Sequence, residues 1–259
     1  MRGQLPEHKL QEIDSLLPQL DDRFPFAAFP GPSVDLYDLT HNGHLGISLA
    51  CLSDSGYRLQ EMRLGLHEAY ACLAWYREET AQPSEFEAVL TSRFYIDHVA
   101  MLLYAAAEDI AAFIINFLEC QDGFVRFAQN LRNARVTSNA AKVGMFLRQH
   151  FADHDITNII FTLHRTPEWD QALEYRNKWV HEQPPLVDGL GIQLNRLSRI
   201  SEDGTSISFG GGAPPEYTID QLLEIMHQAT IAFAACFSQL LDIVIQRREA
   251  LGERFEFDE

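Results

Sequence analysis

Three polar residues near the end of a predicted helix have the side chains that phosphate chemistry needs. They are Arg176, Asn177 and His181, in the stretch EYRNKWVHEQPP. Histidine takes up and releases protons near neutral pH, and arginine carries a permanent charge on a planar group that fits phosphate oxygens. Together these residue types could transfer protons to and from a substrate and bind its phosphate group.

The spacing between the arginine and the histidine is a weak signal by itself. A chain of this composition is expected to contain about two arginines followed by a histidine after four to six residues, and this chain has four, one of which joins Arg148 to His154 between two predicted helices. Arg2 precedes His8 in the N-terminal tail, and Arg93 precedes His98 inside the most apolar predicted helix. Only the pair that begins at Arg176 combines a neighbouring asparagine, a helix end and a following Pro-Pro pair. This context singles it out.

The helix that carries this pair has clear predicted boundaries. Thr166 is a typical N-cap residue, and Pro167 suits the first helical position. Pro184 disfavours helical geometry in Gln183, so the helix must end there. We therefore expect His181 to lie in its last turn.

Helical geometry also predicts which of the three side chains can meet. At ~100° per residue, Asn177 and His181 share one face, whereas Arg176 and His181 diverge by about 140° unless the last turn loosens. Asn177 is thus expected to orient the imidazole, and Arg176 to reach a substrate near the helix end.

Apolar periodicity predicts the frame around this helix, and the predicted fold class is all-α. Ser84 with Glu87, and Thr218 with Gln221, form capping-box patterns at the start of two long helices. We expect the helices to pack as an antiparallel bundle. The predicted helices span residues 7–20, 54–79, 84–120, 138–151, 154–165, 166–183 and 218–248.

Three segments lie outside or interrupt the predicted bundle, which covers residues 54–248. Residues 1–53 are expected to be a short helix and an irregular arm, because prolines and glycines crowd this stretch. Residues 186–217 contain alternating segments around an EDG turn, which predicts a small β-hairpin insertion. Residues 249–259 form an acidic C-terminal tail.

Composition limits the class of protein. The chain has 259 residues, 46% of them hydrophobic, and a formal net charge of -17, which counts against a general nucleic-acid coat protein. Four scattered cysteines without a CxxC pair predict free thiols in a reducing compartment, and the polar N-terminus predicts no secretion signal. Charged residues interrupt the most apolar stretch, residues 94–119. We therefore expect a cytoplasmic protein with no membrane segment.

The sequence offers no motif for a metal or a cofactor. It lacks a P-loop ending and a G-x-S-x-G nucleophile motif, and it has one Glu-x-x-His pair, Glu224 with His227, whereas a di-iron bundle needs two. His41 with His44, and His150 with His154, have no further ligand set at zinc-finger spacing. We expect neither a metal nor a cofactor.

The sequence RNKWVH, residues 176–181, resembles the R-x(4–6)-H signature of HEPN domains, an all-α superfamily that includes many metal-independent endoribonucleases. An asparagine directly after the arginine is frequent in that superfamily. HEPN domains are antiparallel bundles in which long apolar helices flank the helix with the signature, so the likeness covers most of residues 54–248. The long central helix and the inserted hairpin are most similar to an uncharacterised bacterial branch.

The resemblance implies a role for each candidate residue. His181 would be the general acid and base, Arg176 the phosphate clamp and Asn177 the orienting residue, in a homodimer whose two signatures line one cleft. A polar residue on a neighbouring helix assists some HEPN signatures, and Glu108 and Asp109 are the candidates here. Structural pairing with an arginine is the favoured explanation for both.

RNA is the substrate that the resemblance implies. The stretch from Arg126 to Lys178 contains eight basic and five acidic residues, which makes a basic island on an acidic chain. The candidate RNA-binding residues are Arg132, Arg135, Lys142 and Lys178.

Two alternatives stay open at this point. Arg176 and His181 are equally explained as the polar end of a structural helix, with Arg176 paired to Glu174 or Asp170 and His181 capping helix carbonyls. A HEPN-like bundle without activity would instead bind a protein or a nucleotide. For an active enzyme, the expected setting is phage defence or a toxin with a cognate antitoxin.

Overall fold

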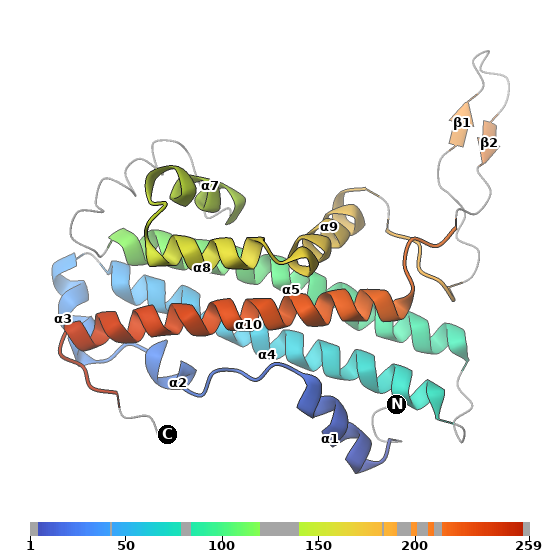
Figure 1. Cartoon of the computed structure of the whole chain (residues 1–259), viewed down its shortest axis with the longest axis horizontal. Helices are drawn as coiled ribbons and strands as arrows, with labels where there is room; N and C mark the ends of the chain where they lie inside the picture. Colours follow the sequence, from blue (N-terminus) through green and yellow to red (C-terminus); the bar gives the residue numbers. More distant parts are fainter. Residues whose placement is uncertain are drawn as a thin grey trace.

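The computed structural model describes residues 5–41, 43–78, 84–119, 140–182, 184–190, 198–200, 207–209 and 214–255 (Figure 1). The protein is mostly helical, which confirms the predicted all-α class. The helices are α1 (Glu7–Leu16), α2 (Phe24–Ala27), α3 (Pro32–His41), α4 (His44–Arg77), α5 (Glu85–Glu119), α7 (Ala140–His150), α8 (Asp155–His164), α9 (Pro167–His181) and α10 (Ile219–Ala250).

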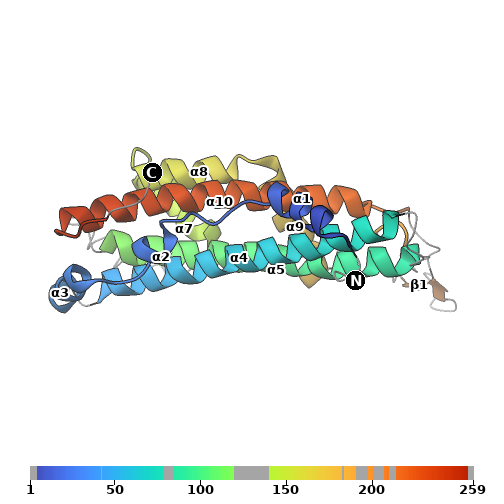
Figure 2. The ribbon, with the colours of Figure 1, turned by 90° about the horizontal axis from the view of Figure 1, so that it is seen from below.

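The long helices α4, α5 and α10 form the body of the molecule and lie along its long axis (Figures 1 and 2). Helices α4 and α5 are antiparallel. The hydroxyl of Ser55 donates to the carbonyl of Ala106 (3.4 Å), and that of Ser92 donates to the carbonyl of Ala69 (3.2 Å). The end of α5 thus lies beside the start of α4, and the start of α5 beside the end of α4, as in an antiparallel pair.

Helix α10 completes the body and also runs antiparallel to α4. Tyr70 bonds to the ring of His227 (2.7 Å), and Arg77 pairs with Asp220 (2.7 Å) at the end of α4. The helices α7, α8 and α9 cover one side of α5 and α10, whereas α1, α2 and α3 contact α4 or α10 from other sides (Figures 1 and 2).

Glycines on α4 allow its neighbours to approach closely. A Cβ atom on Gly56 would lie 2.4 Å from the ring of Phe24, and one on Gly65 would lie 2.8 Å from a methyl group of Val99. Neither position has room for a side chain without a shift of its neighbours. Gly56 therefore belongs to the packing of the N-terminal segment against the bundle.

The predicted irregular course of the N-terminal arm is wrong for residues 24–27 and 32–41, which form α2 and α3. Pro25 lies in the first turn of α2, and Pro32 is the first residue of α3. The N–H groups of a first turn have no partner inside the helix, so a proline, which has no N–H, costs no hydrogen bond there. Gly43 precedes α4 with a φ of 77°, a left-handed conformation that favours glycine. These residues begin helices and do not prevent them.

The first two predicted helices have different limits in the structure. The helix predicted to begin at residue 54 begins at His44. The polar residues Ser53 and Ser55 resemble a helix start in the sequence, but both are buried within α4. The first helix ends at Leu16, four residues earlier than predicted, because Pro18 disfavours helical geometry in Leu17.

Local capping signals place the starts of other helices correctly. Thr218 and Gln221 form the predicted capping box at the start of α10. The backbone N–H of Glu87 donates to the hydroxyl of Ser84 (3.1 Å), immediately before α5. Two short strands, β1 (Ser198–Ile200) and β2 (Ile207–Phe209), pair antiparallel and project from the bundle, whereas the predicted EDG turn lies outside the described residues (Figure 1).

Two of the helices are long and apolar enough to cross a membrane by length and composition alone. They are α5, over Glu85–Leu118, and α10, over Ile219–Ala250, and half of the most apolar window of each is buried inside the bundle. Core helices of soluble bundles have the same properties. The expectation of no membrane segment stays a prediction, and it rests on charged residues such as Asp97 within α5.

Candidate functional site

Helix α9 buries one face in the core. Beside that face, Arg176 contacts α5 near the surface of the protein. Trp169, Ala172 and Tyr175, spaced three residues apart, are its buried residues. The indole of Trp169 stacks on the ring of Phe233 from α10, with ring centroids 6.0 Å apart. This packing fixes the rotation of α9 and places Arg176 beside α5.

Four side chains come together where α9 ends, and we refer to them as the Arg176 cluster: Tyr104, Arg176, Asn177 and His181. The guanidinium carbon of Arg176 lies 3.8 Å from the centroid of the Tyr104 ring, as in a cation–π contact. Arg176 Nη1 donates to Asn177 Oδ1 (3.0 Å) and lies 3.3 Å from His181 Nε2. Tyr104, which comes from α5, was not among the residues predicted from the sequence.

His181 is the last residue of α9, in the last turn as predicted, and its side chain is exposed. Because a guanidinium group only donates hydrogen bonds, Nε2 of His181 must be the acceptor in this contact. A neutral ring then has its proton on Nδ1. Nε2 thus has a lone pair that can take a proton, and it lies within hydrogen-bond distance of the Arg176 guanidinium group.

The contacts within the cluster differ from those predicted on an ideal helix. Asn177 was expected to orient the imidazole, but its amide oxygen accepts from Arg176. Arg176 was expected to diverge from His181, yet its long side chain reaches back to the ring. The asparagine therefore positions the arginine, and the arginine contacts the histidine.

No acidic side chain neutralises Arg176 among the described residues. Glu174, one of its two candidate partners, pairs instead with Lys178 (3.1 Å), one turn further along α9. The Nε atom of Arg176 is buried and has no hydrogen-bond partner in the described part of the chain. The cation is held by a tyrosine ring, an amide oxygen and an imidazole, and its charge is left for an anion.

The two candidate auxiliary carboxylates lie in different surroundings. Glu108 accepts a hydrogen bond from the backbone N–H of Ala140 (3.2 Å), the first residue of α7. Asp109 forms an ion pair with Arg58 of α4, and burial raises the pKa of its carboxyl group. The structure thus gives Asp109 the arginine partner that the favoured explanation predicted. The printed partner of Glu108 is a backbone N–H and not an arginine.

The candidate RNA-binding residues are only partly described. Arg132 and Arg135 lie outside the described residues, and Lys142 is exposed on α7. Lys178 lies near two carboxylates, those of Glu174 (3.1 Å) and Glu216 (3.8 Å), and the hydrogen bond to Glu174 is the largest cause of its raised pKa. Its charge is largely compensated within the molecule.

A second polar group joins the same two helices about two turns closer to the N-terminus of α5. Tyr175 donates to Asp97 Oδ1, and Arg93 Nε lies 3.6 Å from the other carboxylate oxygen. Arg93 also donates to the carbonyl of Pro185 (3.1 Å). Burial raises the pKa of Asp97, although Tyr175 and Arg93 lower it in part. Sequence patterns did not predict this group, because its members lie about 80 residues apart.

A cavity of about 170 Å³ adjoins the Arg176 cluster, between α5, α7, α8, α9 and α10. It shares Tyr104 and Asn177 with the cluster, and its other lining residues are mostly apolar. Trp169, His164 and Glu108 contribute further polar groups to its wall. The indole N–H of Trp169 is buried and has no hydrogen-bond partner among the described residues.

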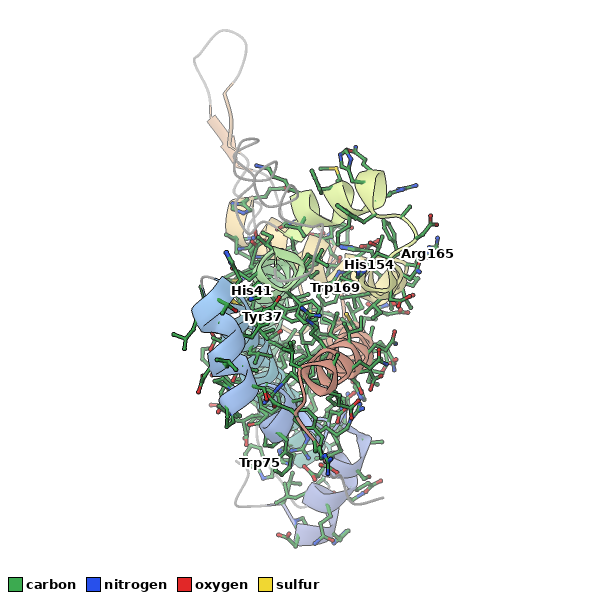
Figure 3. All side chains as sticks on the ribbon, turned by 90° about the vertical axis from the view of Figure 1, so that its left-hand side faces the viewer. Tyr37, His41, Trp75, His154, Arg165 and Trp169 are labelled. Carbon is green, nitrogen blue, oxygen red and sulfur yellow. The ribbon has the colours of Figure 1, made fainter. Side chains whose placement is uncertain are left out.

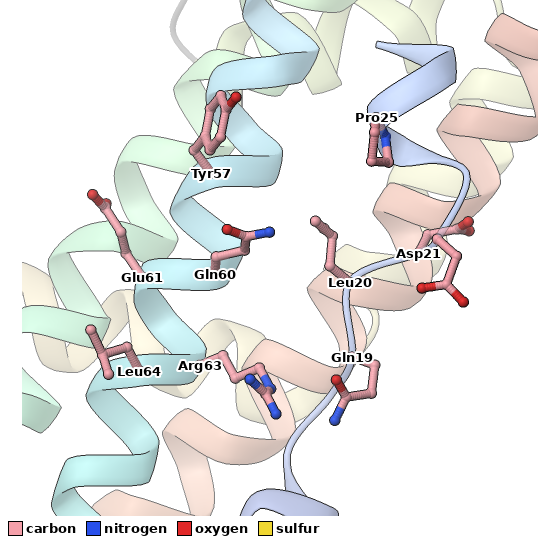
Figure 4. Close-up of a pocket in the computed structure, with 10 residues that line it drawn as sticks. Gln19, Leu20, Asp21, Pro25, Tyr57, Gln60, Glu61, Arg63 and Leu64 are labelled. Carbon is pink, nitrogen blue, oxygen red and sulfur yellow. The ribbon is translucent and has the colours of Figure 1, made fainter.

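A larger hollow of about 860 Å³ lies elsewhere, between α4 and the segment that joins α1 to α2 (Figure 4). Two of its charged side chains have partners: Asp21 pairs with Arg23 (2.6 Å), and Arg63 pairs with Asp14 (2.5 Å). Arg23 lowers the pKa of Asp21 to about 2. This hollow is an open groove in which the charges serve to attach the N-terminal segment.

The histidine pairs considered for metal binding have structural contacts. His41 stacks on Tyr37, with ring centroids 3.7 Å apart, and His154 accepts from the backbone N–H of Ile156 (3.2 Å) at the start of α8 (Figure 3). Among the described residues, no group of three His, Cys, Asp or Glu side chains is placed to hold a metal ion.

The described cysteines are free thiols. Cys72 and Cys236 are buried, and Cys51 is partly buried. Burial raises the pKa of the Cys236 thiol to about 12, which disfavours the reactive thiolate. Cys120 lies outside the described residues.

No protein-family model matches the chain, and no match was found among the curated proteins or the solved structures.

Proposed function

We propose that the protein is a metal-independent endoribonuclease of the HEPN type, with Arg176 as the phosphate ligand and His181 as the general acid and base. One observation carries the proposal: Arg176 has no acidic partner among the described residues and lies 3.3 Å from the exposed His181. A phosphate that binds this arginine lies beside an imidazole nitrogen that can accept a proton.

The chemistry follows from this arrangement. The 2′-oxygen attacks the adjacent phosphorus as its proton passes to a histidine, and the bond from phosphorus to the 5′-oxygen breaks as that oxygen takes up a proton. The products are a 2′,3′-cyclic phosphate and a 5′-hydroxyl. Arg176 stabilises the negative charge that develops on the phosphorane. Asn177 and Tyr104 hold the guanidinium group in place.

A homodimer would supply a second histidine, so that one acts as base and the other as acid. The two helices that carry the cluster suit such an interface, because large apolar side chains are exposed on both of them. Phe86, Leu90 and Phe94 recur every four residues along α5, and Trp179 and Val180 lie near the end of α9. Exposed aromatic residues are enriched at the centres of protein interfaces.

The first test is incubation of the purified protein with a mixed RNA substrate in the presence of EDTA. His98→Ala is the matched control for His181→Ala, since both histidines follow an arginine after four residues and both are exposed. We expect the wild type and His98→Ala to cleave RNA, leaving 2′,3′-cyclic ends, and His181→Ala to lose cleavage. Cleavage that persists in His181→Ala would sink the proposal.

The alternative is a bundle without activity that binds a protein, such as an antitoxin, or a nucleotide. Two observations favour it: Arg176 and His181 bond to each other, and Lys178 is paired with carboxylates. It predicts that no RNA is cut by a dimeric, folded wild-type protein, and that Arg176→Ala abolishes binding of the partner. For the enzyme, we propose a cytoplasmic role in phage defence or as a toxin.

A further inference from the structure

We propose that the cavity beside the Arg176 cluster binds a pyrimidine base, so that the site recognises a pyrimidine nucleotide whose phosphate lies on Arg176. The inference rests on the proposed role of Arg176 as the phosphate ligand. It goes further because it names the base, and because the residues that line the cavity, apart from Asn177, lie outside the R-x4-H signature.

The size of the cavity fits one aromatic ring. A cavity of about 150 Å³ in the core of a protein holds a benzene molecule. The volume here is about 170 Å³. A six-membered pyrimidine ring fits this volume, whereas the nine ring atoms of a purine would need a cavity about half as large again as that of benzene.

The wall of the cavity is apolar with a few polar groups, as in sites that bind flat heterocycles. Aliphatic and aromatic side chains form most of it. The apolar lining residues are Ala107, Ile110, Ala111, Ile114, Ala140, Ala141, Val143, Ile160, Leu163, Leu173 and Phe233.

The polar groups match the edge of a pyrimidine. The indole N–H of Trp169 is a donor without an acceptor among the described residues, although its side chain is only 1% exposed. A buried donor of this kind needs a partner, and a ring carbonyl of uracil or cytosine supplies one. Glu108, which also lines the cavity, supplies an acceptor for a ring or exocyclic N–H.

His164 adds a neutral group to the same wall. Burial lowers the pKa of its imidazole, which keeps the ring uncharged at neutral pH. Among the described residues that line the cavity, no cation would draw the phosphate inside. The charge that binds phosphate lies at Arg176, which contacts the shared residues Tyr104 and Asn177.

Binding of nucleotides tests the inference without reference to cleavage. Calorimetric titration of the full chain would compare UMP, CMP, AMP, GMP and ribose 5-phosphate. We expect UMP or CMP to bind at least about tenfold more tightly than the purine nucleotides and ribose 5-phosphate. Equal affinities for all five compounds, or no binding of any, would overturn the pyrimidine site.

Two variants locate the binding. Gly144 lines the cavity, and a Cβ atom there would meet only His164, at 3.7 Å, so Gly144→Leu fills the space without a clash at Cβ. It should abolish the preference for pyrimidines, whereas Met145→Leu, on the exposed side of the same helix, should not. Trp169→Phe keeps a ring on Phe233 but removes the N–H, and should weaken UMP binding about tenfold. Unchanged pyrimidine binding in both cavity variants would contradict the assignment.

RNA cleavage separates this inference from the proposed function. Pyrimidine binding without RNA cleavage would support the site and overturn the endoribonuclease, leaving a free nucleotide as the ligand. Cleavage that depends on His181 but occurs equally beside all four bases, with no nucleotide preference in the titration, would overturn the site alone. Cleavage next to pyrimidines, lost as a preference in Gly144→Leu, would support both.

Discussion

Two arginines between α5 and α9 share the same spacing to a histidine but have opposite surroundings. Arg93, on α5, is only 7% exposed, pairs with Asp97 and donates to a backbone carbonyl. Arg176, on α9, lies on the ring of Tyr104 and bonds to His181, with no carboxylate partner among the described residues. The first arginine is neutralised inside the protein, whereas the second keeps a charge for a ligand.

The difference shows that spacing alone does not distinguish a structural arginine from a functional one. A buried cation must be paired, and its pair is then costly to break. A cation stacked on an aromatic ring remains charged and partly accessible. The partner on α5 decides which kind of arginine each one is: Asp97, one turn along the same helix, for Arg93, and the ring of Tyr104 for Arg176.

Removal of the two arginines should separate stability from activity. Arg93→Ala leaves Asp97 buried without its cation, and we expect a loss of about 3–5 kcal/mol in the free energy of unfolding. Arg176→Ala should cost about 1 kcal/mol or less, yet abolish RNA cleavage. Urea denaturation followed by circular dichroism gives the first quantity, and equal losses of stability would refute the distinction.

Removal of the Tyr175 hydroxyl tests how much one hydrogen bond to Asp97 contributes to stability. Tyr175→Phe removes the donor to Asp97 but keeps the ring, so we expect a loss of about 1–3 kcal/mol in unfolding free energy. Tyr104→Phe is the matched control, since Tyr104 contacts Arg176 through its ring face. It should be nearly neutral in the same denaturation experiment. A neutral Tyr175→Phe would show that Asp97 does not need this bond.

Substitution of Tyr104 tests whether its ring positions Arg176 for phosphate binding. Tyr104→Leu removes the cation–π contact, worth about 0.5–2 kcal/mol, and should weaken phosphate binding by roughly 2- to 30-fold. Tyr104→Phe should keep wild-type affinity. Titration with UMP measures both variants, and a phenylalanine as weak as leucine would mean that the hydroxyl, and not the ring face, holds Arg176.

Titration of Asp97 gives the smallest expected effect. Because burial raises the pKa of Asp97 above 3.8, the folded protein binds this proton more tightly than the unfolded chain does. Its contribution to stability therefore falls as pH rises from about 4 toward the raised pKa, by less than about 1.4 kcal/mol per pH unit. The unfolding free energy of the wild type minus that of Asp97→Asn should decrease over this range. An increase would mean that Arg93 outweighs burial.

Local signals in the sequence predicted the end of α9 and the start of α10 well. Pro184 and the Thr218 capping box act within a few residues of the positions they mark, so no knowledge of the fold is needed. His181 was placed in the last turn for this reason. The same local logic failed at Pro25 and Pro32, because a proline that can break a helix can also begin one.

Three of the four members of the Arg176 cluster could be predicted from the sequence, and the fourth could not. Arg176, Asn177 and His181 lie within six residues, whereas Tyr104 comes from another helix and looks like any aromatic residue on an apolar helix. An ideal helical wheel separates Arg176 from His181, but it ignores the reach of a long side chain. The cavity next to the cluster depends on five helices at once and has no signal in any single stretch of sequence.

The N-terminal segment is held in place by the last helix of the chain. Arg248, only 3% exposed, donates to the carbonyls of Phe26 and Ala27, while Phe24 packs on Phe237 with ring centroids 5.6 Å apart. During synthesis α2 leaves the ribosome long before α10 does. The contacts of Phe24, Phe26 and Ala27 with α10 can therefore form only after α10 has been translated, so α2 reaches its final packing late in folding.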